Sequence, residues 1–194
     1  MAKQSLYVNF ATTEGVANYA WLNKPDTGSD FSDGKYKVTV VWNKDDAGVA
    51  KLKEVIADAA KREFGDTLPA NFNNPLKDGD TTDKEQYQGK FYATFKSTKR
   101  PGQVDAKNFE LPEDVIIMSG DQIRVAGAAK AYTGAQKGVA LYLNMVKLIN
   151  KNNTGGATAS DVFGDDEGFT AGTTTANVTE EVDAGSNELD IDDL

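Results

Sequence analysis

Cations and aromatic residues are interleaved along several stretches of the sequence, most of them at even spacing. Even spacing places side chains on one face of a β-strand, because successive side chains point to opposite faces. Phosphates attract cations without demanding one geometry, and a flat ring stacks an unpaired base for roughly 1–3 kcal/mol. The pattern predicts a surface that binds single-stranded nucleic acid. The predicted aromatic residues are Tyr19, Trp21, Tyr92 and Tyr132, and the predicted phosphate contacts are Lys35, Lys37, Lys90, Lys96, Lys99, Arg100, Arg124 and Lys130.

Each of these residues alone has a plainer explanation. A Lys on a solvent-facing strand is usually just solvated, and a half-exposed Tyr often packs on a neighbouring loop. The hypothesis therefore depends on the same pattern recurring over several strands.

The residue types exclude most catalytic chemistry. The chain has no Cys and no His, so disulfides, zinc–thiolate sites and His-assisted nucleophiles are ruled out. The stretch DGDTTDKE (78–85) hints at a calcium loop, but Asp83 stands where that loop requires Gly. We expect no catalysis, no metal and no cofactor. A nuclease using carboxylates and a divalent ion stays open as an alternative, although no three acids converge in the sequence.

Charge is divided unevenly along the chain. The net charge is −9, with 21 Lys and Arg against 30 Asp and Glu. Residues 152–194 contain 11 of the acids and no base, so residues 1–151 are slightly basic. This second segment is rich in Gly, Ser, Thr, Asn and Ala and has no hydrophobic period, which is typical of disorder. We expect a flexible acidic tail from 152 to 194, with 1–151 as the folded domain.

The folded part reads mainly as strands. Alternation of apolar and polar residues predicts strands within 5–12, 15–22, 34–42, 87–97, 121–134 and 139–149. A 3.6-residue period predicts one helix over 45–65, which Asp45 or Asp46 caps and Gly65 ends. Residues 69–86 and 98–108 read as loops. We therefore expect a mainly β fold with one or two helices: a five-stranded Greek-key barrel of the OB-fold kind, with a helix after the third strand.

Several blocks of the sequence resemble bacteriophage single-stranded-DNA-binding proteins. NYAWLNKP, KYKVTVVW, LKEVIADAAKREFG, NPLKDGD, GKFYATFKSTKRPGQVD and KGVALYLNMVKLI occur in the order seen in that family, within residues 5–150. The resemblance implies an OB-fold core, an acidic C-terminal tail and coating of single strands during phage replication, recombination and annealing. Several members are dimers, so it also implies a homodimer as a candidate state.

The last residues, DIDDL, raise a separate hypothesis. The family's tail ends in acids and a bulky apolar or aromatic residue, and here Leu194 takes that place. A tethered polyanion occupies a basic groove weakly and is displaced by DNA. The resemblance implies that the displaced tail recruits replication proteins such as a polymerase, helicase or primase. Its expected contact residues are Asp190, Ile191, Asp192, Asp193 and Leu194.

Two further expectations concern location and the main alternative function. The N-terminus lacks the features of a signal peptide and no apolar run reaches membrane-spanning length, so we expect an intracellular protein of the host cytoplasm. The alternative function is a non-enzymatic structural or interaction protein of a phage particle, in which the barrel is a scaffold and the tail binds.

Overall fold

Alternating residues of β3 (Tyr36–Asn43) form one wall of the hydrophobic core. In the computed structural model, which describes residues 5–28, 30 and 32–152, Val38, Val40 and Trp42 of this strand are all buried. Ala93 and Phe95 repeat the pattern on β6 (Lys90–Ser97). Branched and aromatic side chains at every second position suit a strand with one buried face. The core faces predicted for these two strands are confirmed.

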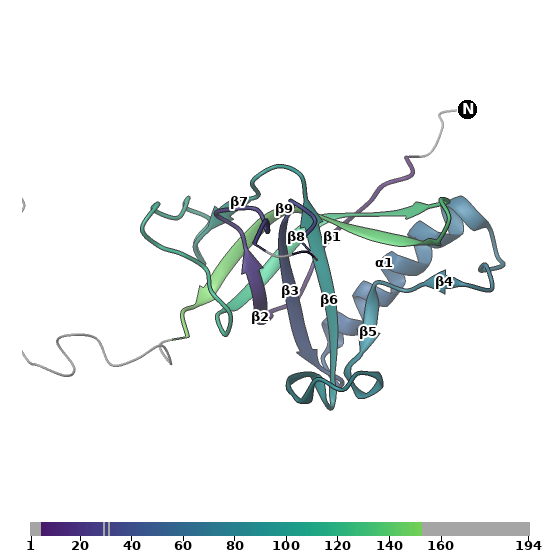
Figure 1. The fold of residues 1–194 in the computed structure, drawn as a ribbon, viewed down its shortest axis with the longest axis horizontal. Coiled ribbons are helices and arrows are strands. Elements are labelled where there is room, and N and C mark those ends of the chain that lie inside the picture. The colour runs from purple at the N-terminus through teal and green to yellow at the C-terminus, as the bar shows by residue number, and fades with distance from the viewer. Residues whose placement is uncertain (1–4, 29, 31, 153–194) are drawn as a thin grey trace, which may run out of the picture. The chain divides into compact units, whose positions relative to one another are not determined.

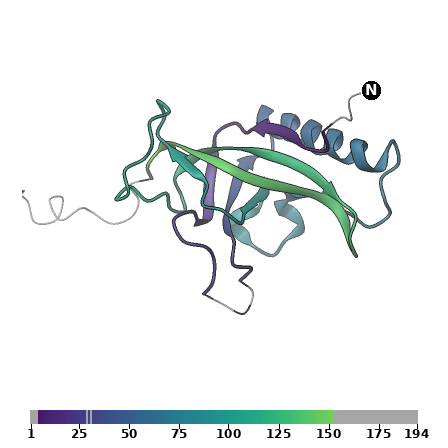
Figure 2. The ribbon, with the colours of Figure 1, turned by 90° about the horizontal axis from the view of Figure 1, so that it is seen from above.

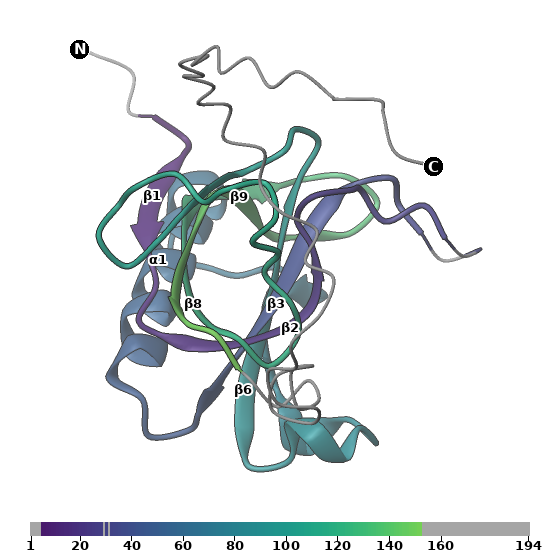
Figure 3. The same cartoon turned by 90° about the vertical axis from the view of Figure 1, so that its left-hand side faces the viewer.

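Five strands close into a barrel. β2 (Gly15–Trp21), β3, β6, β9 (Lys137–Asn150) and β8 (Gln122–Tyr132) pair in that order, and β8 returns to pair with β2 (Figure 3). β6 and β9 run parallel, and the other neighbours in the ring are antiparallel. The fifth pairing removes the free sheet edge. The mainly β, five-stranded barrel expected from the sequence is confirmed.

The helix α1 (Ala47–Phe64) follows β3, the third strand along the chain, as predicted (Figure 1). Asp46 is the N-cap, and its carboxylate accepts a hydrogen bond from the Gly48 amide at 2.6 Å and one from the Thr13 hydroxyl at 3.0 Å. Gly65 ends the helix with a φ of 72°, a conformation that glycine adopts readily. The buried stripe consists of Val49, Leu52, Ile56, Ala59 and Ala60.

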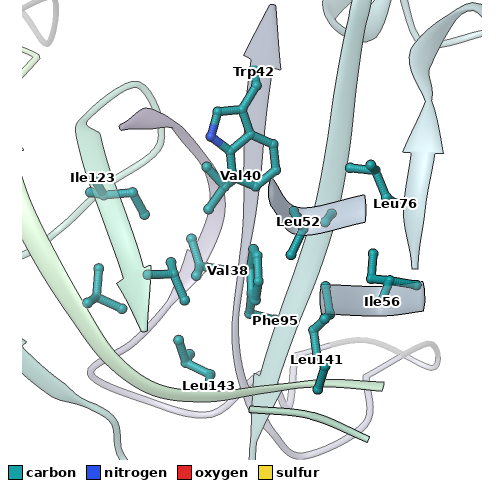
Figure 4. Close-up of a cluster of buried hydrophobic side chains, with 14 of the residues drawn as sticks. Val38, Val40, Trp42, Leu52, Ile56, Leu76, Phe95, Ile123, Leu141 and Leu143 are labelled. Atoms are coloured by element: carbon teal, nitrogen blue, oxygen red, sulfur yellow. The ribbon is translucent and has the colours of Figure 1, made fainter. Parts of the chain in front are cut away.

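Helix α1 lies beside the long β8–β9 hairpin, which runs on beyond the barrel (Figures 1 and 2). The apolar stripe of α1 packs against the side chains inside the barrel, and together they form one continuous core. Figure 4 shows Leu52 and Ile56 of α1 next to Phe95 of β6, Leu141 of β9 and Leu76. The hairpin thus has one face against the helix and leaves the other free for a surface site.

The two expected loops contain short strands and turns. Residues 69–86 hold β4 (Phe72–Asn73), β5 (Leu76–Asp78), and the 3-10 turns η1 (Gly79–Thr81) and η2 (Glu85–Tyr87). Residues 98–108 hold β7 (Gly102–Val104), which pairs with β9. β1 (Val8–Ala11) pairs with β8. The prediction of pure loops was wrong because segments of two or three residues show no measurable period and are fixed by their partner strands.

The acidic stretch that hinted at calcium has a structural role. Lys44 forms ion pairs with Asp78, at 2.7 Å, and with Asp80. These contacts lower the pKa of both carboxyls, and the hydrogen bond from Lys44 is the largest cause for each. Asp80 also accepts a hydrogen bond from the Gly89 amide. The two carboxylates therefore tie the β5–β6 connection to the end of β3.

The chain divides into two units, Met1–Gly156 and Ala157–Leu194. The expected tail lies outside the described residues from 153 onward, and so do its contact residues Asp190, Ile191, Asp192, Asp193 and Leu194. Among the described residues, no helix is long and apolar enough to cross a membrane.

Candidate nucleic-acid interface

A groove of about 1100 Å³ crosses the outer face of the barrel over β2, β3, β6 and β9. Its walls come mostly from strand positions that point away from the core, together with a stretch of β9, the β4–β5 segment and the end of β8. The groove brings together seven of the twelve residues proposed from the sequence. They are Tyr19, Trp21, Lys35, Lys37, Tyr92, Lys96 and Tyr132.

A β-bulge turns the two aromatic residues of β2 toward the groove. Ala17 is 1% exposed and faces the core, so regular alternation would send Tyr19 and Trp21 inward as well. The register of β2 against β3 shifts between Asn18 and Trp21, and Tyr19 has a φ of 48°. The two rings are consequently 47% and 40% exposed. A non-glycine residue in this left-handed region is strained, and such strain is common at binding sites.

Tyr92 is supported from behind by a residue that the sequence did not single out. Its ring stacks on Tyr87 of η2, with 4.2 Å between ring centroids and 13° between the planes. Tyr87 is 2% exposed, and its burial raises the pKa of its phenol. Lys84 of the same turn lines the groove and lies 5.4 Å from the Tyr19 ring centroid. Residues 69–86 were expected to be a loop, so no hydrophobic period in the sequence indicated that Lys84 would line the groove.

Tyr132, at the end of β8, lines the groove beside β4. Its hydroxyl accepts a hydrogen bond of 2.9 Å from the Asn73 side chain of β4. Asn73 also accepts a hydrogen bond of 2.7 Å from Lys77, another groove cation that was not predicted. β4 thus fixes the position of a ring and a cation together.

Two of the predicted cations are already paired with carboxylates of the β2–β3 connection. Lys37 forms ion pairs with Asp26 and, at 3.7 Å, with Asp33. Lys96 bonds to Asp33 at 2.7 Å. The hydrogen bond from Lys37 lowers the pKa of Asp26, and the one from Lys96 lowers the pKa of Asp33. These acids neutralise part of the positive charge that Lys37 and Lys96 bring to the groove.

The other five predicted cations do not line the groove. Lys90 starts β6 opposite Asn43, and Lys99 is exposed in the turn after β6. Arg100 lines a separate pocket of about 250 Å³. Arg124 donates a hydrogen bond of 2.9 Å to the Thr12 carbonyl. Lys130 lies 4.8 Å above the ring of Tyr7.

Tyr142 of β9 lines the groove and is 41% exposed. It sits in the apolar run 139–149, which the sequence presents as a buried strand, so its outward direction was missed. In the sheet it is the register partner of Lys96. The register continues across β3 and β2, which places four outward residues in one row: Trp21, Lys37, Lys96 and Tyr142.

Comparison with known proteins adds an independent result. The family model described as the ssDNA-binding protein of Enterobacter phage Enc34 matches residues 11–173. The structure of the bacteriophage Enc34 single-stranded DNA-binding protein in complex with ssDNA is similar, with a TM-score of 0.62 and 20% identity over 76% of this chain and 89% of that one. Gp2.5, a single-stranded DNA binding protein encoded by bacteriophage T7, aligns with a TM-score of 0.60 and 21% identity over 86% of this chain and 100% of its own. No sequence among the curated proteins matches. The two structural likenesses show a shared fold.

Proposed function

The chain belongs to the Enterobacter phage Enc34 ssDNA-binding protein family, and from that premise we propose that it binds single-stranded DNA in the groove, without sequence preference. The observation that carries this proposal is the row Trp21, Lys37, Lys96, Tyr142, which places two cations between two rings along one outward line. Adjacent strands lie about 4.8 Å apart, so the row offers a ring, two charges and a second ring at short intervals. Stacking and charge are sequence-tolerant, because every base has a flat face and every nucleotide a phosphate.

The position of the groove also supports this function. If β1 and β2 are taken together as the first strand of the barrel, β3 and β6 are the second and third. In OB barrels the face of the second and third strands binds oligonucleotides, together with the first–second and fourth–fifth loops. Here those loops are the β2–β3 connection, which carries Asp26 and Asp33, and the β8–β9 turn beside Tyr132.

Single strands should bind in preference to duplex. In a duplex the base faces are covered by stacking, so Trp21, Tyr92 and Tyr132 have nothing to stack on. The finer role we propose is coating of single strands during phage DNA replication, recombination and annealing, in the host cytoplasm. Binding and release suffice for that role, and no catalytic step or cofactor is required.

The acidic tail is proposed to compete with DNA for the groove. The chain leaves the described region at Asn152, whose amide donates to the buried Asp121 carboxylate at 2.8 Å. Asp121 also holds Lys151 at 3.0 Å, and its backbone carbonyl accepts from the Ala17 amide, two residues before Tyr19. The root of the tail is thus next to the strand that carries Tyr19 and Trp21. If residues 153–194 are disordered, as the sequence predicts, a chain of this length would reach on the order of 35 Å and would hold its acids at high effective concentration around the groove.

Displacement by DNA would expose the last residues to partners. We propose that Asp190–Leu194 recruit a replication protein such as a polymerase, helicase or primase, and that a homodimer is one assembly state.

A chain ending at Asn152 keeps the Asp121 contacts and is the suitable comparison for testing the competition between tail and DNA. It should bind DNA more tightly than the full chain at low salt and equally at high salt, since screening removes the competition. Equal affinity of the two chains at all salt concentrations would show that the tail does not compete with DNA for the groove.

The proposed function is tested by the anisotropy of labelled oligo(dT) and of a duplex of equal length. Full-length protein should bind the single strand more tightly, and the double variant Tyr92→Ala, Tyr132→Ala should lose roughly tenfold or more in affinity. Phe109→Ala is the matched control, because Phe109 is 67% exposed and does not line the groove. Thermal unfolding verifies that each variant is folded. No binding by the full chain or by the chain ending at Asn152 would overturn the proposal and favour the scaffold role in a phage particle.

A further inference from the structure

A second aromatic and cationic patch lies next to the groove, on β8, β9 and the residues just before β1. The rings of Tyr7 and Tyr142 are 6.0 Å apart between centroids and inclined at 54°. Lys130 of β8 lies 4.8 Å from the Tyr7 ring centroid. Tyr7 is 48% exposed and Tyr142 is 41% exposed, although each ring already has a neighbour. We refer to Tyr7, Lys130 and Tyr142 as the Tyr7 patch.

The Tyr7 patch and the groove share Tyr142 and are parts of one surface. Tyr142 lines the groove and is the register partner of Lys96 on one side and of Ala128 on the other. Ala128 in turn is the partner of Asn9 on β1, two residues after Tyr7. Register partners share a face of a sheet, so the outward row that begins at Trp21 continues over β9 and β8 to β1.

The backbone at Tyr7 is held in place, which distinguishes it from a loose chain end. The Arg62 guanidinium of α1 donates to the carbonyl of Ser5 at 2.8 Å and to that of Tyr7 at 3.4 Å. Arg62 is itself oriented by two hydrogen bonds to Asp58, of 3.0 and 2.6 Å, and these lower the pKa of that carboxyl. A ring that is half exposed on an anchored backbone offers a stacking surface at low entropic cost.

We propose that single-stranded DNA leaves the groove over Tyr142 and stacks a further base on Tyr7, with Lys130 contacting the adjacent phosphate. This inference rests on the proposed function and deepens it, because it specifies the path that the DNA takes across the barrel surface. It also gives Lys130 its place: this cation does not line the groove, but it lies on the continuation of the path. The path then runs from Trp21 on β2 to Tyr7 before β1.

The competing explanation is that Tyr7 and Lys130 merely cover the small residues of β8. Ala128, which shares the outer face of β8 with Lys130, is 7% exposed. Packing alone predicts that removal of Tyr7 changes stability and leaves DNA affinity unaltered at every DNA length. A stacking role predicts a change in affinity that depends on length.

Oligo(dT) length therefore provides the test. The full chain, Tyr7→Ala, Tyr7→Phe and the control Phe109→Ala are titrated with labelled oligo(dT) from about 3 to about 20 nucleotides, a range that spans the site sizes of OB-fold proteins. For the shortest oligomers, which the groove alone accommodates, all four proteins should bind alike. For the longest, Tyr7→Ala should bind roughly tenfold more weakly, while Tyr7→Phe keeps the ring and the affinity. Affinity should stop rising at a shorter length for Tyr7→Ala than for the other three.

The outcomes separate this inference from the function on which it rests. If the full chain binds no oligomer, the proposed function itself is wrong. If the full chain binds but Tyr7→Ala matches it at every length, the function stands and the extension over Tyr7 is wrong. If Tyr7→Ala is weaker on long oligomers only and Tyr7→Phe is not, the path over the Tyr7 patch is established.

Discussion

Lys96 of β6 and Tyr142 of β9 are register partners, and within the described residues they are the one such pair that joins these two strands. The parallel seam of the barrel is therefore narrow, whereas β3 and β6 are paired along their full length. The groove lies across this seam and takes a cation from one side and a ring from the other. The closure of the barrel and the composition of the site thus depend on the same non-local contact.

The two tryptophans should report differently on DNA binding. Trp21 lines the groove and is 40% exposed, whereas Trp42 is 4% exposed within the core. A base stacked on Trp21 should quench its fluorescence, so oligo(dT) should quench the solvent-exposed component of the emission. Trp21→Phe should keep most of the affinity, because Phe also stacks, and should lose the quenching. Quenching of equal size in Trp21→Phe would contradict the placement of DNA against β2.

Removing the carboxylate of Asp33 should strengthen DNA binding. Asp33 forms ion pairs with both Lys37 and Lys96, so its removal frees Lys96 for phosphates and leaves Lys37 with Asp26 as its one carboxylate partner among the described residues. Since partly exposed pairs contribute about 0.2–1 kcal/mol, Asp33→Asn should lower the dissociation constant by up to about fivefold at low salt. Asp66→Asn is the charge-matched control, because Asp66 pairs with Lys61 on α1, outside the groove. Equal gains in the two variants would mean that net charge alone is responsible.

Two substitutions at Tyr19 should separate backbone strain from stacking. Both Tyr19→Gly and Tyr19→Ala remove the ring, so both should weaken oligo(dT) binding by roughly tenfold. Only glycine relieves the strain of the φ of 48°, so Tyr19→Gly should be more stable than Tyr19→Ala by about 1 kcal/mol in urea unfolding. Lower stability of the glycine variant would refute the view that the bulge is strained in order to present the ring.

Stability should be flat between pH 5 and 8 and should fall in acid. The chain has no His and no Cys, so no side chain with an ordinary pKa titrates in the neutral range. Lys37 and Lys96 lower the folded-state pKa of Asp26 and Asp33 below 3.8. A depressed pKa contributes stability that is present above the unfolded value and lost as pH falls through the folded value. The free energy of unfolding of the full chain, measured in urea, should therefore fall from about pH 4 downward.

Asp26→Asn provides the control for this pH dependence. The variant lacks one of the depressed carboxyls, so its free energy of unfolding should fall less between pH 5 and pH 3 than that of the full chain. The same fall in both proteins would show that the Asp26–Lys37 pair does not account for the acid sensitivity.

Local sequence patterns were enough to predict the fold. The period-2 alternation of Val38, Val40 and Trp42 fixes the inner face of β3, and the period of α1 with its Asp46 cap and Gly65 stop fixes the helix. Such signals are local, so a single sequence carries them.

Several features of the site were beyond the sequence because they are set by contacts between distant segments. The bulge between Asn18 and Trp21 changes which face Tyr19 occupies, and no residue type announces it. Tyr142 points outward because it alternates with the buried Leu141 and Leu143, but its place beside Lys96 is set by the pairing of β9 with β6. Arg100 is part of the most basic run in the sequence, yet the turn after β6 carries it to another pocket.

The most direct test of the account is to locate the DNA on the protein. Oligo(dT) that carries iododeoxyuridine is bound to the full chain and irradiated, and the cross-linked residues are identified by mass spectrometry. DNA bound in the groove should give adducts at groove aromatics, namely Tyr19, Trp21, Tyr92, Tyr132 or Tyr142. Adducts confined to rings outside the groove, such as Phe109 or Phe64, would contradict it.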